Sequence, residues 1–171
     1  MKIFKWVYLK NFFANIVIFF LMSIVITYIC EKIPKEMYSC KNWLLRERKW
    51  EKKGLIYQRL LKVKSWKKYL IELNDFIKSV FPKKHIPEYS KEYLSRYLAE
   101  CCKSELAHWT IIFSTFLFWV FNDFNTFFTM LLVAVVLNLP YIIIQRYNRP
   151  RILQIIKHMD NVTQFCAVNE R

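Results

Sequence analysis

The chain has 171 residues, of which 55% are hydrophobic and 18% are aromatic, and its formal net charge is +14. It contains a single glycine, Gly54, so a glycine-rich loop that cradles a nucleotide phosphate is excluded. The length indicates one domain, and we expect residues 1–171 to form a single membrane domain.

Uncharged apolar runs predict spans at about 11–30, 104–122 and 124–145. A membrane helix takes about 20 residues, and the shorter middle run is accommodated by snorkelling or bilayer thinning. The first run is too long for a signal-peptide core and no small-residue cleavage site follows it, so it is predicted to be an uncleaved anchor. The predicted fold class is an all-α integral membrane protein with about three membrane helices plus cytoplasmic interfacial amphipathic helices.

Basic residues are concentrated between the first two spans. Residues 31–103 hold 19 of the 27 Lys and Arg but only 9 of the 13 Asp and Glu, whereas the turn "NDFN" has no basic residue. The positive-inside rule therefore predicts a multi-pass protein of the cell membrane, with residues 31–103 and the tail 146–171 in the cytoplasm and the turn outside. Three crossings then put the N-terminus outside, against three N-terminal lysines, so its side is left open: Lys2, Lys5 and Lys10.

Over residues 41–81, Trp, Leu and Ile alternate with Lys and Arg at near-helical spacing. Amphipathic helices of this composition lie in the membrane interface, and the anionic inner leaflet attracts their charge. Membrane lipids, and no nucleic acid, are thus the expected partners. Gly54 is expected to end a helix, and Ser90 to cap one that continues into the second span. The cysteines show no metal spacing, and reduced thiols are favoured over palmitoylation of Cys101 and Cys102.

Polar residues at membrane depth form two clusters. Glu105 and His108 are three residues apart and share a helix face at the start of the second span. Asn138 and Gln145 are two turns apart on the third span, just before an arginine-rich stretch. Because a tight turn makes the two spans antiparallel, both clusters must reach the same, cytoplasmic, membrane face.

Two interpretations of these clusters are open. A histidine with a carboxylate on its own face is the arrangement of a general base with an orienting partner. Alternatively, Glu105 pairs with Arg146 or Arg149 to hold the hairpin together, and His108 hydrogen bonds at the helix interface.

Three stretches carry a family resemblance: "WEKKGLIYQRLLKVKSWKKYL", "ECCKSELAHW" and "NLPYIIIQRYNRPRI". They match a Glu-x-x-Gly-x-x-Tyr stretch with a basic Val-x-x-Trp-Lys, a Glu-x-x-Lys/Arg-x-Glu-x-x-His-Trp pattern, and an Asn-x-Pro-x4-Gln-Arg-Tyr-Asn-Arg-x-Arg pattern. In these residues the chain resembles the glycosyl-4,4'-diaponeurosporenoate acyltransferases of carotenoid pigment synthesis. The resemblance covers roughly residues 45–155, and residues 68–93 depart from it.

The resemblance implies transfer of a fatty acyl group onto a sugar hydroxyl of a membrane glycolipid on the cytoplasmic side. An acyl thioester (acyl-CoA or an acyl carrier) is the expected donor and the glycolipid the acceptor, with no permanently bound cofactor and no metal. The oligomeric state is not predicted. The alternatives are a non-catalytic membrane adaptor and a transferase acting on another isoprenoid or cell-envelope lipid.

The predicted mechanism has His108, oriented by Glu105, deprotonate the sugar hydroxyl, which attacks the thioester. Hydrogen-bond donors and cations would stabilise the oxyanion and hold the phosphates of the carrier. The residues expected to stabilise the oxyanion are Asn138, Gln145 and Arg146, and those expected to hold phosphate are Arg149 and Arg151. The remaining candidate substrate-binding residues are Glu51, Trp66, Trp109, Tyr147 and Asn148.

Overall fold

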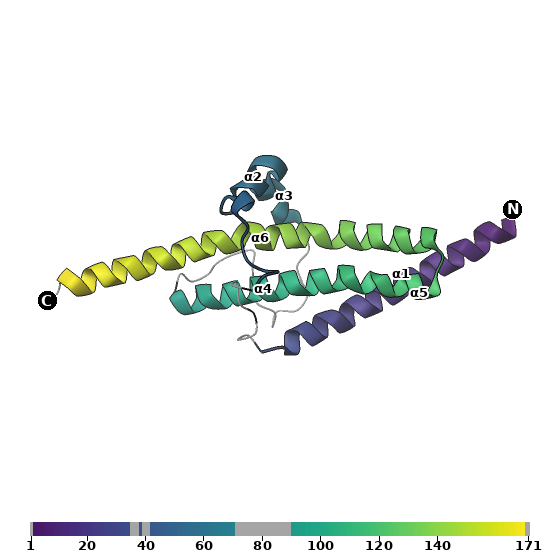
Figure 1. The fold of residues 1–171 in the computed structure, drawn as a ribbon, viewed down its shortest axis with the longest axis horizontal. Coiled ribbons are helices and arrows are strands. Elements are labelled where there is room, and N and C mark those ends of the chain that lie inside the picture. Colours follow the sequence, from purple (N-terminus) through teal and green to yellow (C-terminus); the bar gives the residue numbers. More distant parts are fainter. Residues whose placement is uncertain (1, 35–37, 39–41, 71–89, 170–171) are drawn as a thin grey trace. The chain divides into compact units, whose positions relative to one another are not determined.

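The computed structural model describes residues 2–34, 38, 42–70 and 90–169, in which the regular elements are all helical. Its long helices are α1 (Lys2–Lys32), α4 (Lys91–Ser114) and α6 (Phe124–Asn169) (Figure 1). The short elements are the 3-10 turns η2 (Lys49–Glu51), η3 (Lys67–Tyr69) and η5 (Thr115–Leu117) and the helices α2 (Leu55–Leu61), α3 (Val63–Trp66) and α5 (Phe118–Phe121). Among the described residues, three stretches are long and apolar enough to cross a membrane: Phe12–Lys32, Lys91–Phe121 and Phe124–Asn161. The predicted all-α membrane fold is confirmed.

The chain divides into two compact units. Unit 1 comprises Met1–Pro34 and Leu106–Ile142, and unit 2 comprises Lys35–Glu105 and Ile143–Arg171. Helices α4 and α6 each contribute one part to unit 1 and another to unit 2.

Unit 1 has an apolar core that α1 shares with α4, α5 and α6. The buried members of this core are Phe19, Ile111, Phe118, Phe127, Met130 and Ala134. On α1, the core-facing residues are spaced three or four apart and therefore lie on one face of the helix; they are Phe12, Ile16, Phe19, Met22 and Ile26. The other faces of α1 expose large apolar side chains, as expected of a helix in contact with lipid: Phe13, Val17, Phe20, Leu21 and Ile24.

A polar contact ties α1 to the turn between the second and third spans. The amide nitrogen of Asn15 donates to Oδ1 of Asn122 at 2.8 Å, and Asn15 is buried. The start of the apolar part of α1 therefore lies at the turn end of unit 1, and the helix runs away from it towards Lys32. This is the direction that three membrane crossings require.

The same turn supplies the cap of α6. Oδ2 of Asp123 accepts hydrogen bonds from the backbone amides of Asn125 and Thr126, and Oδ1 accepts one from the Thr126 hydroxyl. The hydrogen bonds from Thr126 lower the pKa of the Asp123 carboxyl. A carboxylate in this position satisfies amides that the first helical turn leaves without partners.

Unit 2 is built on the first part of α4 and the last part of α6. Apolar residues recur at spacings of three and four on both helices, and they pack into one cluster: Tyr93, Leu94, Tyr97, Leu98 and Cys101 with Ile152, Ile155, Ile156 and Met159. This packing explains why α6 continues past the predicted span end at 145 and through Pro150. The predicted tail 146–171 is helical as far as Asn169.

The start of α4 agrees with the sequence prediction. The Ser90 hydroxyl accepts a hydrogen bond from the backbone amide of Tyr93 at 3.3 Å, and α4 continues into the second span. Cys101 and Cys102 are fully buried, so neither is exposed for palmitoylation.

The segment 42–70 is made of short turns and helices rather than long amphipathic helices. Lys52, Lys53 and Lys62 have positive φ angles and interrupt it. Gly54 precedes α2 as its N-cap residue, with φ 78°, so the prediction that it ends a helix is wrong. The predicted interfacial residues 71–81 lie outside the described part of the chain. Large side chains along the rest of the segment are exposed: Trp43, Trp50, Leu55, Leu60 and Tyr69.

Candidate functional site

Arg146, on α6, is the centre of a buried ion-pair network in unit 2. Its Nε donates to Oε1 of Glu105 on α4, and its Nη1 donates to Oε1 of Glu51 in η2, both at 2.7 Å. Its Nη2 donates to the backbone carbonyl of Leu44, also at 2.7 Å. One guanidinium thus joins three segments that are far apart in sequence, which a lysine cannot do because it lacks the planar fork of donors.

Arg149 lies one turn further along α6 and shares Glu105 with Arg146. Its Nη2 pairs with Oε2 of Glu105, and its Nη1 donates to Sγ of Cys102 at 3.5 Å. Glu105 is fully buried and Arg149 is 4% exposed. Each carboxylate oxygen of Glu105 therefore has a cation within contact, as a charge needs when it is taken out of water. The contacts predicted by the structural interpretation of Glu105 are confirmed.

Tyr57 lies next to this network, on α2. Burial, followed by the carboxylate of Glu51, raises the pKa of the Tyr57 hydroxyl far above its usual value, while Arg146 lowers it. The hydroxyl therefore stays protonated, and it is available as a hydrogen-bond donor to the Glu51 side of the network.

Two cations lie over the ring of Tyr147. The Nζ of Lys67 lies 5.4 Å from the centre of its ring, and the guanidinium carbon of Arg151 lies 4.0 Å away. The ring is fully buried, and its hydroxyl has no hydrogen-bond partner among the described residues. Asn148, the next residue, accepts a hydrogen bond from Lys67 at 3.4 Å and donates one to the hydroxyl of Tyr97 at 3.3 Å.

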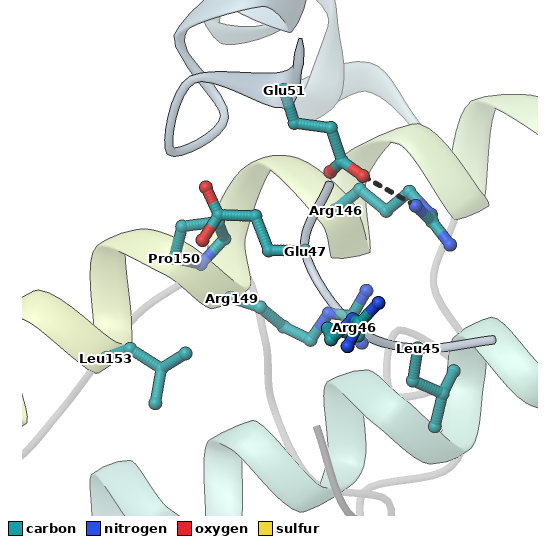
Figure 2. A pocket seen from close by; sticks show the side chains of 8 residues that line it. All are labelled: Leu45, Arg46, Glu47, Glu51, Arg146, Arg149, Pro150 and Leu153. Atoms are coloured by element: carbon teal, nitrogen blue, oxygen red, sulfur yellow. Dashed lines mark hydrogen bonds and ion pairs between the residues drawn. The ribbon is translucent and has the colours of Figure 1, made fainter. Parts of the chain in front are cut away.

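A pocket of about 140 Å³ lies beside the ion pairs of unit 2. One of its walls is the face of α6 that carries Arg146, Arg149, Pro150 and Leu153; the other is the segment with Leu45, Arg46, Glu47 and Glu51 (Figure 2). Figure 2 also shows the Glu51–Arg146 ion pair at its edge. The pocket therefore combines three guanidinium groups and two carboxylates with apolar side chains.

His108 belongs to unit 1, where α4 faces α6. Its Nδ1 lies 2.8 Å from Oδ1 of Asn138. The amide nitrogen of Asn138 donates to the carbonyl of Ala134 at 2.8 Å, which directs Oδ1 towards the imidazole. The Nδ1 atom that faces this oxygen therefore carries a proton. Tyr141 stacks on the imidazole with ring centres 4.8 Å apart.

The other residues predicted for the site have these places. Gln145 is buried in unit 2; its Nε2 donates to Ser104 at 3.3 Å, and its Oε1 has no partner in the described part of the chain. The Trp66 indole donates to the Leu61 carbonyl at 2.7 Å. Trp109, in unit 1, stacks on Phe113 with ring centres 6.0 Å apart.

Sequence reasoning did not assign several residues that complete these contacts. Tyr141 follows Asn138 by three residues and so lies on the same face of α6, which is a signal that spacing gives. The Leu44 carbonyl has no such signal, because its contact depends on how the loop segment folds onto α6. Tyr97 contacts Asn148 between α4 and α6, and spacing along one helix does not give that pair. Arg46 was not singled out among the many basic residues of its segment.

Residues 41–158 match the glycosyl-4,4'-diaponeurosporenoate acyltransferase family. The chain is 26% identical over 161 residues to a glycosyl-4,4'-diaponeurosporenoate acyltransferase of Staphylococcus aureus (strain MRSA252), covering 92% of this chain and 94% of that protein. It is 23% identical over 154 residues to the protein of the same name from S. aureus (strain bovine RF122 / ET3-1), covering 88% and 90%. No solved structure matches the chain.

The fold and these matches define the class of protein as a helical membrane acyltransferase, as predicted. The alternative of a non-catalytic adaptor is not favoured. The chain belongs to the glycosyl-4,4'-diaponeurosporenoate acyltransferase family.

Proposed function

We propose that this protein transfers a fatty acyl group from an acyl thioester to a sugar hydroxyl of a glycosylated carotenoid in the cell membrane. The names of the relatives support a glycosylated carotenoid as the acceptor. The charge distribution supports a reaction on the cytoplasmic side. The observation that carries a mechanism is the contact of His108 with Asn138.

In this mechanism the Nε2 atom of His108 is the general base. It takes the proton of the sugar hydroxyl while the hydroxyl oxygen forms a bond to the thioester carbonyl carbon. The tetrahedral intermediate then breaks its C–S bond, the ester remains, and the imidazolium returns its proton to the leaving thiolate. No external oxidant, reductant or metal is needed for this balance.

Asn138 is the positioning residue of this base. Its Oδ1 holds the Nδ1 proton, and its Nδ2 is engaged with the Ala134 carbonyl. These contacts favour a role for Asn138 in orienting His108 over its predicted role in stabilising the oxyanion. The stacked ring of Tyr141 further restricts the imidazole, and an imidazole held in one tautomer and orientation loses less freedom in the transition state.

Glu105 and Arg146 are assigned a supporting role. The carboxylate of Glu105 pairs with Arg146 and Arg149, and three donors of Arg146 are directed at protein acceptors. Such a network fixes the second and third spans and the loop segment in unit 2. The predicted orientation of His108 by Glu105, and the oxyanion roles of Gln145 and Arg146, stay predictions.

The test is lipid mass spectrometry of cells that make a glycosylated carotenoid and express the intact protein or a variant. Cells with the intact protein should contain the acylated product. His108→Ala and His108→Gln should each lower its rate of formation by about 10²–10⁴-fold, the usual cost of losing a base. His158→Ala is the matched control, because His158 is exposed on α6, and it should retain full activity. Near-normal activity of His108→Gln would show that His108 is not the general base.

A further inference from the structure

Three arginines line the pocket of unit 2, and two of them, Arg146 and Arg149, are held in place by contacts within the protein. Arg149 is held by Glu105 and Cys102. Arg46 is exposed, and its guanidinium makes no hydrogen bond or ion pair with any residue that the structure describes. Its neighbour Glu47 accepts a hydrogen bond from the backbone amide of Lys53 at 2.7 Å. The positive charge of Arg46 at the pocket is thus not matched by a contact within the protein.

The size and lining of the pocket define the chemistry that it accepts. A volume of about 140 Å³ is below the roughly 300–1,000 Å³ of sites that enclose a whole small molecule. It suits a single phosphate group with a short part of the chain attached to it. The guanidinium of Arg46 offers a planar set of donors to phosphate oxygens, and Arg149 adds the donor hydrogens that Glu105 and Cys102 leave. Leu45, Pro150 and Leu153 offer apolar contact to the adjoining atoms.

The surroundings favour an anion as well. Lys49, Lys52 and Lys53 follow Arg46 closely and are exposed, so they raise the local concentration of negatively charged ligands. The carboxylates of Glu51 and Glu105 are directed at Arg146 and Arg149 and compensate those cations from within the protein. Glu47 also lines the pocket, with Oε1 accepting from the Lys53 amide, and the guanidinium of Arg46 is the one in the lining that no carboxylate of the described residues pairs with.

We propose that this pocket binds a phosphate ester, with Arg46 and Arg149 contacting its oxygens, and that its ligand is the phosphorylated carrier arm of the thioester donor. This rests on the proposed function for the identity of the ligand. A phosphate ester is also present in an anionic lipid headgroup. The experiment therefore compares a carrier with a lipid as the ligand.

The experiment measures binding to the purified full-length protein in nanodiscs of phosphatidylcholine. The probes are coenzyme A without an acyl group and a short-chain phosphatidic acid. Arg46→Ala should weaken coenzyme A binding at least tenfold, because one charge-assisted contact is lost, and binding should weaken further as salt is raised. Arg59→Ala, which removes the same charge from an exposed position on α2, should change binding less than twofold.

The outcomes separate the sources and the two proposals. A tenfold effect of Arg46→Ala on phosphatidic acid but not on coenzyme A would overturn the carrier assignment and make the pocket a lipid site. Equal behaviour of Arg46→Ala and Arg59→Ala towards both probes would overturn the phosphate site, even if acyl transfer is observed. Loss of binding in Arg46→Ala supports the site whether or not the glycolipid is acylated, because the assay needs no chemical step. Both variants should keep the melting temperature of the unmodified protein.

Discussion

The Oδ1 atom of Asn138 lies 2.8 Å from Nδ1 of His108, and the amide that carries it is held by the Ala134 carbonyl. The amide from α6 therefore holds the imidazole from α4 in place. The tautomer follows from the hydrogen bonds alone, because a carbonyl oxygen accepts only from a protonated nitrogen.

We predict that Asn138→Leu lowers kcat for acyl transfer by about 10–100-fold, as is common when the group that orients a functional imidazole is removed. KM for the glycolipid should change little, because Asn138 does not contact the acceptor in the proposed mechanism. Asn138→Asp keeps an acceptor oxygen at Nδ1 and should recover part of the lost rate. Steady-state kinetics of the purified variants would measure this; a changed KM with an unchanged kcat contradicts the orienting role.

The ion pairs of Glu105 lead to a prediction about stability. Glu105→Gln leaves Arg146 and Arg149 buried without their shared carboxylate, and breaking a buried pair in this way costs about 3–5 kcal/mol. Glu47→Gln, at the exposed side of the same pocket, is the control and should leave the free energy of unfolding nearly unchanged. Denaturant unfolding in detergent would compare the two variants. A Glu105→Gln protein of normal stability that has lost acyl transfer would instead support the catalytic interpretation.

Hydrophobic patterning predicted the three long helices because an uncharged run of about 20 residues has few alternatives to a membrane span. The segment 42–70 was harder to predict. Its apolar residues have helical spacing, but left-handed backbone at Lys52, Lys53 and Lys62 breaks it into short pieces. Lysine carries no sequence signal for positive φ, unlike glycine.

The candidate site was predicted in part for a similar reason. Antiparallel spans bring His108 level with Asn138, and Glu105 level with Arg146, and both pairs are in contact. Which acceptor each side chain selects is decided by atomic distances that spacing does not give. The contact between Nδ1 of His108 and Oδ1 of Asn138 was therefore beyond sequence reasoning.

Gly54 provides a test of how the loop segment rests on α6. Its φ is 78°, and a Cβ atom there would lie 3.0 Å from the backbone carbonyl oxygen of Tyr147. Gly54→Ala combines left-handed strain of about 1–2 kcal/mol with a collision against backbone, and it should lower the free energy of unfolding by at least that amount. Lys62→Gly is the matched control: Lys62 has φ 48°, so glycine there should be neutral or stabilising. Equal effects of both changes would contradict the close approach to α6.

The last prediction concerns the side of the N-terminus. Asn15 donates to Asn122 at 2.8 Å, so the beginning of the apolar part of α1 and the turn before α6 lie at the same end of unit 1. The N-terminal lysines would favour the cytoplasm, but the basic segment 31–103 carries far more charge and fixes the opposite end there. We therefore predict that the N-terminus and the turn are both outside.

Single cysteines at Lys5, Lys32 and Asn125, in a background without the native cysteines, test this orientation. An impermeant thiol reagent added to intact cells should label the cysteines at Lys5 and Asn125 and leave the one at Lys32 unlabelled, because Lys32 ends α1 on the other side. Inside-out vesicles should reverse the pattern. Labelling of Lys5 and Lys32 from one side would mean that α1 does not cross the membrane. Labelling of Lys32 alone from outside would keep the three crossings but invert the protein, which moves residues 31–103 and the proposed phosphate site to the outer face.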